Sequence, residues 1–408
     1  MKIKAINGVR DILPDEVMIW RNIEKTAYDI FRRFGIQEIR LPVLEKTELF
    51  TRSIGETTDI VEKEMYSFVD KGISMRPEIT ASLLRAYVEH GLHVRQPVQR
   101  LFSIGPVFRH ERPQKGRQRQ FHQVDVEIIG AREAQVDAEL MAMGQMLLTD
   151  LGLNVSLEIN SLGCPECRPD FRKKLIDYLH ERRDILCDDC KRRTEKNPLR
   201  VLDCKQQACR ATVQEAPSIL DNLCSACDEH FAVVQNQLNL LDVSYTLNRF
   251  MVRGLDYYNR TTFEFLTSDL GAQAAVAAGG RYDGLIEQLG GPKNTPGIGF
   301  AMGMERMVLL IQQQEERPEG EGGADLFVAA LGEQAIAFAA PVVHQLRQLG
   351  LQAAMDYSNR SLKAQMKQAG RCNAGFTLIV GEQELEQGRG ILRNMNTQEQ
   401  SEFSLQGT

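Results

Sequence analysis

FRHERPQKGRQRQFHQVDVEIIG, residues 108–130, is the most informative stretch of this chain. It predicts a hairpin whose strands cover residues 99–108 and 121–130 and whose tip is basic and contains a glycine. Side chains alternate along a strand, which gives one face Phe121, Gln123, Asp125 and Glu127, and the other His122, Val124, Val126 and Ile128. Burying such a polar face is costly unless it contacts something polar. We therefore expect this strand to line a pocket for a small polar ligand.

The tip of the hairpin carries a local positive charge. Between Arg109 and Arg119, five basic residues oppose one acidic residue, Glu111, which leaves a net charge of +4. The five are Arg109, Arg112, Lys115, Arg117 and Arg119. Guanidinium groups bind phosphate oxygens through paired, charge-assisted hydrogen bonds. The tip is therefore expected to hold a polyanion above the pocket.

The bulk composition is that of a soluble globular protein with two or three domains. The chain has 408 residues, 43% of them hydrophobic and 25% charged. It contains no run of eighteen apolar residues and no apolar signal core near the N-terminus, which predicts a cytoplasmic protein that does not enter membranes. The net charge of −6 means that any surface for nucleic acid must be local.

Eight of the nine cysteines fall between Cys164 and Cys227. They form four pairs: Cys164 and Cys167, Cys187 and Cys190, Cys204 and Cys209, and Cys224 and Cys227. Disulfides are not expected in the cytoplasm, and pairs at this spacing are typical of zinc ligands. However, no histidine completes a finger pattern, so reduced thiols without metal are the alternative. The sequence leaves this choice open, and we assign no metal ligand.

The segment 165–235 differs from its surroundings in composition and apolar periodicity, which indicates an insertion. Its apolar periodicity is weak, and between Arg172 and Arg210 twelve basic residues outnumber seven acidic ones, for a net charge of +5. Such a run of charge indicates either a solvated helical surface or a surface that touches nucleic acid. The two interpretations stand side by side at this point.

The rest of the chain alternates helices and strands around the hairpin. Amphipathic spacing predicts helices over 16–34, 78–90 and 133–151, and Pro42 interrupts a strand that follows the first of them. Residues 297–310 predict a glycine-spaced strand that enters an apolar helix bearing Glu305 and Arg306; such a charged pair is more often a solvated cap than a site. Residues 313–324 have linker composition, and strand–helix alternation in 325–408 predicts a separate α/β domain with parallel strands.

Three segments in this order resemble the motifs of class II aminoacyl-tRNA synthetases. The first helix with Pro42 resembles motif 1, the dimer-interface element; residues 108–130 resemble motif 2; and residues 297–310 resemble motif 3. Two further segments, RGLDYY at 253–258 and AGGRYD at 278–283, are similar to signatures of the histidyl-tRNA synthetase family. RPEIT at 76–80 also matches, although many members have glycine where Ile79 stands.

The resemblance implies an α+β fold: an antiparallel sheet flanked by helices, a mainly helical insertion and a C-terminal α/β domain. The implied domains are a catalytic core over 1–164 and 236–312, the insertion over 165–235, a linker over 313–324, and an anticodon-binding domain over 325–408. The implied activity is the activation of L-histidine with ATP, followed by transfer of the histidyl group to the 3′ end of tRNA(His). The implied partners are ATP with Mg²⁺, histidine, tRNA(His) and a second copy of the chain in a homodimer.

The resemblance also assigns roles to particular residues. Arg109 grips the α-phosphate and the histidine carboxylate, Arg253 lies opposite it, and Arg306 holds the ATP tail and covers the adenine, on which Phe121 stacks from the other side. Glu127 and Tyr258 match residues that read the imidazole ring, Tyr257 lines the same pocket, and Glu78, Thr80 and Gln123 match those that hold the α-amino group. The tip residues Arg112, Lys115, Arg117 and Arg119 meet the acceptor end of the tRNA. Asp125 receives no role.

Two other interpretations compete with this one. A non-catalytic relative, the synthetase-like regulatory subunit of ATP phosphoribosyltransferase, shares the catalytic fold and tends to lose catalytic residues and the C-terminal domain. This chain keeps Arg109, Arg253, Arg306 and residues 325–408, which argues against that alternative. An RNA-contacting adaptor built on zinc-bound cysteines would explain residues 164–227 but would leave the arginines unexplained.

Overall fold

The computed structural model describes residues 3–55, 58, 60–255, 257–270, 275–314 and 323–405. They form two compact units, Met1–Arg317 and Pro318–Thr408. Most of the expected linker, 313–324, lies outside the described residues. In the part of the chain that is described, no helix has both the length and the apolar character needed to cross a bilayer.

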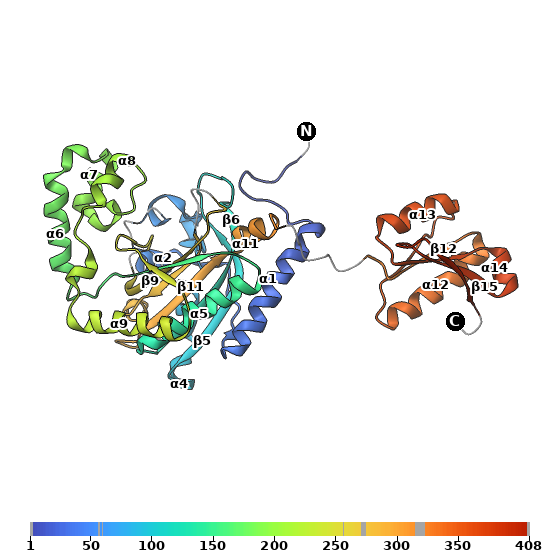
Figure 1. Ribbon diagram of the computed structural model, residues 1–408, viewed down its shortest axis with the longest axis horizontal. Helices are drawn as coiled ribbons and strands as arrows, with labels where there is room; N and C mark the ends of the chain where they lie inside the picture. Colours follow the sequence, from blue (N-terminus) through green and yellow to red (C-terminus); the bar gives the residue numbers. More distant parts are fainter. Residues whose placement is uncertain are drawn as a thin grey trace. The chain divides into compact units, whose positions relative to one another are not determined.

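The first unit is built on an eight-stranded mixed sheet (Figure 1). The edge strands β1 and β8 pair in parallel with their neighbours, and the six strands between them are antiparallel. Across the sheet the order is β1 (Gln37–Glu38), β5 (Gln99–Phe108), β6 (Gln120–Ile129), β11 (Gly297–Gly303), β10 (Ala275–Arg281), β9 (Asn259–Leu266), β7 (Ser156–Ser161) and β8 (Tyr245–Leu247). The predicted hairpin is confirmed as β5 and β6, and the predicted α+β class is confirmed with it.

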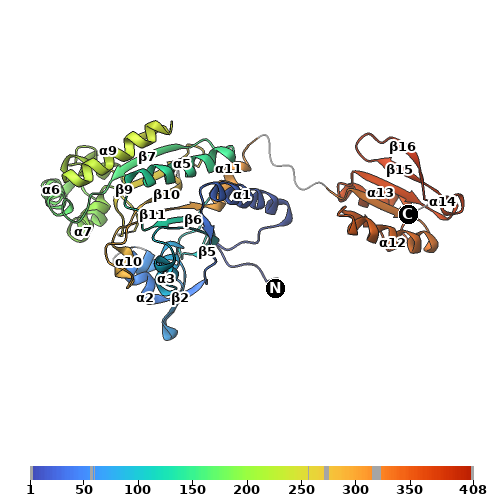
Figure 2. The ribbon, with the colours of Figure 1, turned by 90° about the horizontal axis from the view of Figure 1, so that it is seen from below.

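One face of this sheet is apolar and is covered by four helices. Val124, Val126 and Ile128 of β6 are almost completely buried on this face, as their alternation predicts. Figure 2 shows the helices along the same side of the sheet. They are α1 (Pro14–Arg33), α5 (Ala134–Asp150), α9 (Ser225–Leu240) and α11 (Met304–Ile311), and their apolar residues belong to the same core cluster.

The opposite face is partly covered by smaller elements and holds the polar side chains of β6. Leu83 and Leu84 of one helix pack with Tyr282 and Leu285 on this side. The elements here include α3 (Thr80–Glu89), the short helices α4 (Leu92–Arg95) and α10 (Leu285–Gln288), α2 (Thr47–Ile54), and a small sheet of β2 (Leu44–Lys46), β3 (Ser67–Phe68) and β4 (Ile73–Met75). The space left open between them is the candidate active site.

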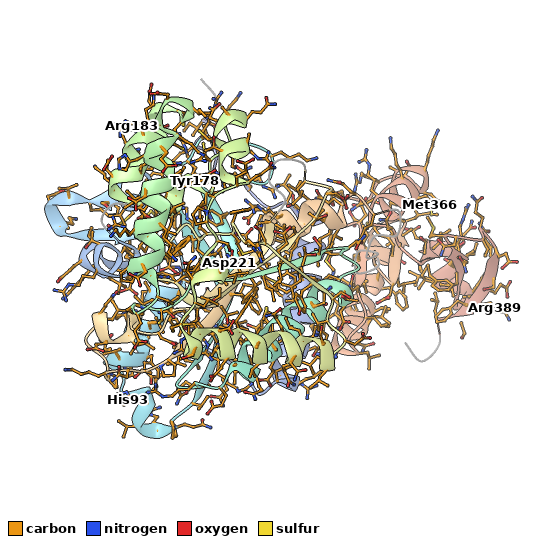
Figure 3. The ribbon with its side chains drawn as sticks, turned by 60° about the vertical axis from the view of Figure 1, so that its left-hand side comes forward. His93, Tyr178, Arg183, Asp221, Met366 and Arg389 are labelled. Atoms are coloured by element: carbon orange, nitrogen blue, oxygen red, sulfur yellow. The ribbon has the colours of Figure 1, made fainter. Side chains whose placement is uncertain are left out.

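The insertion leaves the sheet after β7 and has a small core of its own. Its helices are α6 (Arg168–Glu181), α7 (Asp188–Lys196) and α8 (Gln207–Val213), and its buried cluster runs from Phe171 to Ile219. Tyr178 of α6, labelled in Figure 3, donates a 2.8 Å hydrogen bond to the main-chain oxygen of Thr212 in α8. The expected boundary at 235 differs from the packing, because Phe231 and Val234 of α9 already belong to the core of the large sheet.

The second unit is an α/β domain, as the sequence predicts. Its five strands run in the order β13 (Ala353–Met355), β12 (Leu326–Ala330), β14 (Phe376–Val380), β15 (Arg389–Asn394) and β16 (Gln400–Ser404). The first three pair in parallel, and β15 and β16 add an antiparallel edge that the sequence did not predict. The helices are α12 (Glu333–Gln348), α13 (Leu362–Arg371) and α14 (Glu382–Gln387).

Candidate active site

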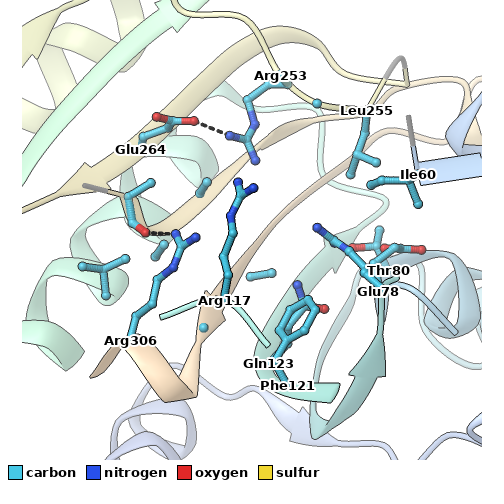
Figure 4. A pocket seen from close by; sticks show the side chains of 18 of the residues that line it. Ile60, Glu78, Thr80, Arg117, Phe121, Gln123, Arg253, Leu255, Glu264 and Arg306 are labelled. Carbon is cyan, nitrogen blue, oxygen red and sulfur yellow. Dashed lines mark hydrogen bonds and ion pairs between the residues drawn. The ribbon is translucent and has the colours of Figure 1, made fainter. Parts of the chain in front are cut away.

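A cavity of about 300 Å³ opens on the polar face of the large sheet. Segments far apart in the sequence converge on it: the start of α3, both ends of the hairpin tip, the loop before β9, and the junction of β11 with α11. The predicted site residues that line it are Glu78, Thr80, Arg109, Arg117, Phe121, Gln123, Arg253, Tyr257, Tyr258 and Arg306. Figure 4 shows most of these side chains around one space. The structure thus brings together residues that the sequence could only associate by motif.

Glu127 lies beneath this cavity and is absent from its described lining. Only 1% of its surface is exposed, and its Oε2 accepts a 2.5 Å hydrogen bond from the Tyr282 hydroxyl. Glu127 stands opposite Gly299 in the adjacent strand, where a Cβ would lie 1.7 Å from the same Oε2. The absence of a side chain at Gly299 therefore makes the room that the carboxylate occupies. Burial raises the pKa of Glu127 to about 8, although the hydrogen bond from Tyr282 opposes this shift.

Asp125 and Glu78 are two more buried carboxyl groups beside Glu127. Asp125 Oδ2 accepts a 3.3 Å hydrogen bond from the Thr80 hydroxyl, and Glu78 Oε1 accepts a 2.9 Å hydrogen bond from the main chain of Ala81. Burial raises the pKa of both carboxyls, and the neighbouring charges of Glu127 and Glu78 raise that of Asp125 further. Asp125 Oδ1 and Gln123 Oε1 are buried without a hydrogen-bond partner within the described structure. Such a set of acceptors suits a ligand that donates hydrogen bonds.

Arginines from three segments surround the other side of the cavity. Arg109 donates from Nε to the main-chain oxygen of Pro77 at 2.9 Å, and its Cζ lies 5.2 Å from the ring centroid of Phe121. Arg253 forms a 2.5 Å ion pair with Glu264, and its Cζ lies 5.2 Å from the ring centroid of Tyr258. Arg306 donates to the main-chain oxygens of Ala275 and Gly116. These contacts hold the guanidinium groups in place before any ligand arrives, which lowers the cost of binding an anion.

The tip residues expected to meet tRNA divide into two groups. Arg112 and Lys115 are exposed to solvent. Arg117 lines the cavity (Figure 4). It also forms a 2.7 Å ion pair with Glu111. Arg119 is tied to the N-terminal segment, because its side chain donates to the main-chain oxygen of Asn7 at 3.3 Å and its own amide donates to Gly8 at 2.7 Å.

Four residues at or next to the site have partners that the sequence did not reveal. Tyr282 and Glu264 are the hydrogen-bond partners of Glu127 and Arg253. Glu305, expected as a solvated cap, is instead 6% exposed and accepts hydrogen bonds from the main chain and ring of His122, which ties α11 to β6. Arg281 points to the apolar face, where it forms a buried 2.7 Å ion pair with Asp137. Because side chains alternate along a strand, the segment AGGRYD already indicates that Arg281 and Tyr282 lie on opposite faces of the sheet.

A largely antiparallel sheet that carries a basic hairpin, an arginine at the start of α11 and a polar pocket between them is the architecture of a class II aminoacyl-tRNA synthetase. The family model described as histidyl-tRNA synthetase matches residues 8–166 and 190–307, and the model described as anticodon binding domain matches residues 325–407. The chain belongs to the histidyl-tRNA synthetase family.

Individual relatives agree with this assignment. A histidine–tRNA ligase of Desulfotalea psychrophila is 61% identical over 405 residues, which cover 99% of this chain and 94% of the relative. A histidine–tRNA ligase of Geobacter metallireducens is 54% identical and covers 100% of this chain and 98% of the relative. The crystal structure of apo Staphylococcus aureus histidyl-tRNA synthetase is 36% identical, covers 99% of this chain and 98% of that one, and superposes with a TM-score of 0.83.

The activity of the chain is therefore that of a histidine–tRNA ligase, which joins histidine to tRNA(His) at the expense of ATP. Histidine, ATP and tRNA are its partners, and the C-terminal unit is an anticodon-binding domain. The comparisons do not favour the regulatory-subunit alternative, because three relatives that are 54–61% identical over almost the full length of this chain are histidine–tRNA ligases.

Proposed function

We propose that the cavity binds ATP and histidine together and that its arginines carry the first reaction. In that step a histidine carboxylate oxygen attacks the α-phosphorus, the bond from the α-phosphorus to the pyrophosphate oxygen breaks, and the bonding electrons leave with pyrophosphate. Arg109 contacts both the α-phosphate and the carboxylate, and Arg253 faces it from the other side. The observation that supports this assignment is the convergence of these two side chains on one cavity, each held by its own neighbour.

The ATP end of the cavity lies at the junction of β11 and α11. Arg306 covers the adenine and holds the phosphate tail, with Phe121 on the opposite side of the base. A planar guanidinium and an aromatic ring suit the two faces of a purine. Support comes from their position in one lining, where the main-chain oxygens of Ala275 and Gly116 orient Arg306.

The histidine end lies over the polar face of β6. Glu127 and Tyr258 read the imidazole nitrogens, Tyr257 packs beside them, and Glu78, Thr80 and Gln123 receive the α-amino group. Three buried carboxyl groups match a ligand that carries an ammonium and an imidazole N–H. An amino acid without that ring would leave buried polar groups unpaired, which explains selection without editing.

Mg²⁺ would reach the site with ATP. Among the described residues, groups of three or more potential ligands at metal-binding distance consist of cysteines, so no carboxylate cage is preformed here. Glu111 and Glu264 nevertheless line the cavity, and one or two carboxylates together with substrate phosphates are the usual Mg²⁺ environment. Held by these residues, the ion would screen the phosphate charge.

The later partners bind around this core. The tip residues Arg112, Lys115, Arg117 and Arg119 contact the acceptor end of tRNA(His), in keeping with their local charge. The chain acts in the cytoplasm as a homodimer through α1 and the segment that follows it, in which Pro42 lies in the connection between β1 and β2. Support for the dimer is the resemblance of this segment to motif 1, the dimer-interface element of class II synthetases.

The assignment is tested by separating activation from transfer. Arg109→Lys should lower histidine-dependent ATP–pyrophosphate exchange by about 10²–10³-fold, because an ammonium cannot reproduce a bidentate contact. The matched control is Arg112→Ala, on the exposed tip, which should leave exchange unchanged and raise the KM for tRNA in aminoacylation. Exchange near the normal rate in Arg109→Lys would refute the role of this arginine.

A further inference from the structure

The eight cysteines of the insertion gather in two groups of four. The first, here called the neck cluster, consists of Cys164, Cys167, Cys224 and Cys227; the second, here called the inner cluster, consists of Cys187, Cys190, Cys204 and Cys209. In each group all four sulfurs lie within 4.8 Å of one another. The pairs of the neck cluster are 60 residues apart in sequence, so their meeting is a property of the fold.

The spacing of the sulfurs is that of a tetrahedron around one metal ion. In the neck cluster, Cys164 Sγ lies 3.7 Å from Cys224 Sγ and 3.8 Å from Cys167 Sγ. In the inner cluster, Cys187 Sγ and Cys204 Sγ are 3.9 Å apart. A Zn–S bond of about 2.3 Å gives a tetrahedral edge of about 3.8 Å, whereas a disulfide holds its sulfurs at about 2.0 Å. The observed separations therefore match ligands that share an ion.

The backbone around both groups favours thiolates. The amide of Cys164 donates to Cys167 Sγ at 3.1 Å, and the amide of Cys187 donates to Cys209 Sγ at 3.3 Å. Cys167, Cys187 and Cys224 cap the N-termini of α6, α7 and α9, where the helix dipole is positive. Gly163 has φ +65°, and a Cβ there would lie 2.7 Å from Cys167 Sγ. The absence of a side chain at Gly163 therefore makes the room that the sulfur of Cys167 occupies.

The insertion also needs such a support. Its buried cluster contains eleven residues, and three of them are the cysteines Cys190, Cys204 and Cys209. A core of this size rarely stabilises a small unit without disulfides or a metal, and the cysteines are free thiols in this structure.

We propose that the neck cluster and the inner cluster each bind one Zn²⁺ as a structural tetrathiolate site. Each site takes four deprotonated cysteines, and the four thiol protons pass to water on binding. Four ligands fill the coordination shell, so neither ion has an open position for catalysis. The inner site holds α7 to α8, and the neck site joins the two points where the chain leaves and re-enters the catalytic core.

The neck site is coupled to the histidine end of the active site. Leu162 donates its amide to the main-chain oxygen of Arg260 at 2.6 Å, and Arg260 donates back to Gly163 at 2.8 Å. Arg168, one residue after Cys167, donates to the main-chain oxygens of Leu162 and Tyr258. The ion at the neck therefore fixes the segment that places Tyr257 and Tyr258, although it lies outside the cavity.

The metal content of the intact, tag-free protein tests the proposal directly. Protein purified with a reductant and without chelator should contain about two zinc ions per chain by emission spectroscopy. Cys167→Ser and Cys209→Ser should each retain about one ion, and the double variant should retain none. Cys372→Ser is the matched control, because Cys372 lies in the C-terminal unit, where its Sγ donates to Gln368, and it should keep both ions.

Two further measurements keep the proposal falsifiable if a variant folds poorly. Unmutated protein reconstituted with Co²⁺ should show the intense visible absorption of tetrahedral cobalt with thiolate ligands. In Cys167→Ser the KM for histidine should rise about tenfold, because Arg168 beside Cys167 bonds the main chain of Tyr258 itself. In Cys209→Ser it should rise less, because the inner part of the insertion reaches this loop further from the tyrosine, through the hydrogen bond from Arg200 to Gly254. Zinc below one ion per chain, iron in its place, or disulfides found by thiol titration would each overturn the proposal. An unchanged histidine KM in Cys167→Ser would overturn the coupling to the pocket.

Discussion

Gly299→Ala should weaken histidine binding although it replaces none of the side chains proposed to contact histidine. The added methyl would lie 1.7 Å from Glu127 Oε2, 2.3 Å from its carboxyl carbon and 2.5 Å from the main-chain oxygen of Val126. An ordinary contact for such a carbon is about 3.5–4.0 Å, so the carboxylate must move by well over 1 Å. Because the side chain is buried, that movement breaks the 2.5 Å hydrogen bond with Tyr282.

The size of the effect follows from the displacement. A misplacement of about 1 Å in a reacting geometry costs about 10²-fold, so kcat/KM for histidine should fall by that factor in pyrophosphate exchange. Overpacking of the sheet should lower the free energy of unfolding by about 1–3 kcal/mol. The KM for ATP should change little, since Arg306 and Phe121 are not displaced.

Gly303→Ala is the matched control on the same strand. A Cβ at Gly303 would lie 3.7 Å from Arg306 Cδ, an ordinary contact at the end of the cavity proposed to bind ATP. This variant should keep its KM for histidine, and any change should appear in the KM for ATP. A histidine KM within about twofold of normal in Gly299→Ala, measured on folded protein, would refute the idea that glycine makes room for Glu127.

Other substitutions probe the buried charges. Glu127→Ala should abolish histidine-dependent ATP–pyrophosphate exchange. Exchange at a near-normal rate would contradict the assignment of this residue to the imidazole ring. The pKa of Glu127 is raised from 4.5 to about 8, so the unfolded chain releases this proton first and the free energy of unfolding falls as pH rises between these values. Glu127→Gln should remove that fall. Its free energy of unfolding, relative to that of the parent protein, should rise by up to about 1.4 kcal/mol per pH unit in urea titrations from pH 5 to pH 8. Parallel plots of this free energy against pH for the two proteins would contradict the prediction. Arg281→Met should cost about 3–5 kcal/mol in the same assay, because it leaves Asp137 buried and uncompensated, and a loss below about 1 kcal/mol would count against this pair as a support of the core.

Much of the fold could be predicted from local patterns. The hairpin follows from period-two alternation and a turn, and the apolar residues Val124, Val126 and Ile128 lie where that alternation places them. The boundary of the insertion could not be found in this way. Composition changes gradually through 225–240, and only the packing of Phe231 shows that α9 belongs to the large sheet.

The site divides similarly between what motifs predict and what only packing reveals. Motif resemblance gathered the arginines and tyrosines of the cavity, but the pairing of Glu127 with Tyr282 joins residues 155 apart in sequence, which no local pattern encodes. The sequence assigned no role to Asp125. In the structure its Oδ2 accepts a hydrogen bond from Thr80, and its Oδ1 has no hydrogen-bond partner among the described residues. The sequence predicted a solvent-exposed Glu305, because the burial of a residue at the start of a helix depends on what packs against it. Here His122 of β6 packs against Glu305.

The closeness of the two ends of the insertion has a practical consequence for protein engineering. Cys164 Sγ and Cys224 Sγ are 3.7 Å apart, so the intervening chain departs from and returns to nearly the same point. A short turn of four to six residues, the common length of a natural connection, could therefore replace residues 168–223. Such a splice would keep all of α9 and its packing on the sheet, whereas a cut at residue 235 would remove most of that helix. The insertion can therefore be deleted while the catalytic core is kept. Comparing the shortened enzyme with the full chain would show what the insertion contributes to tRNA charging.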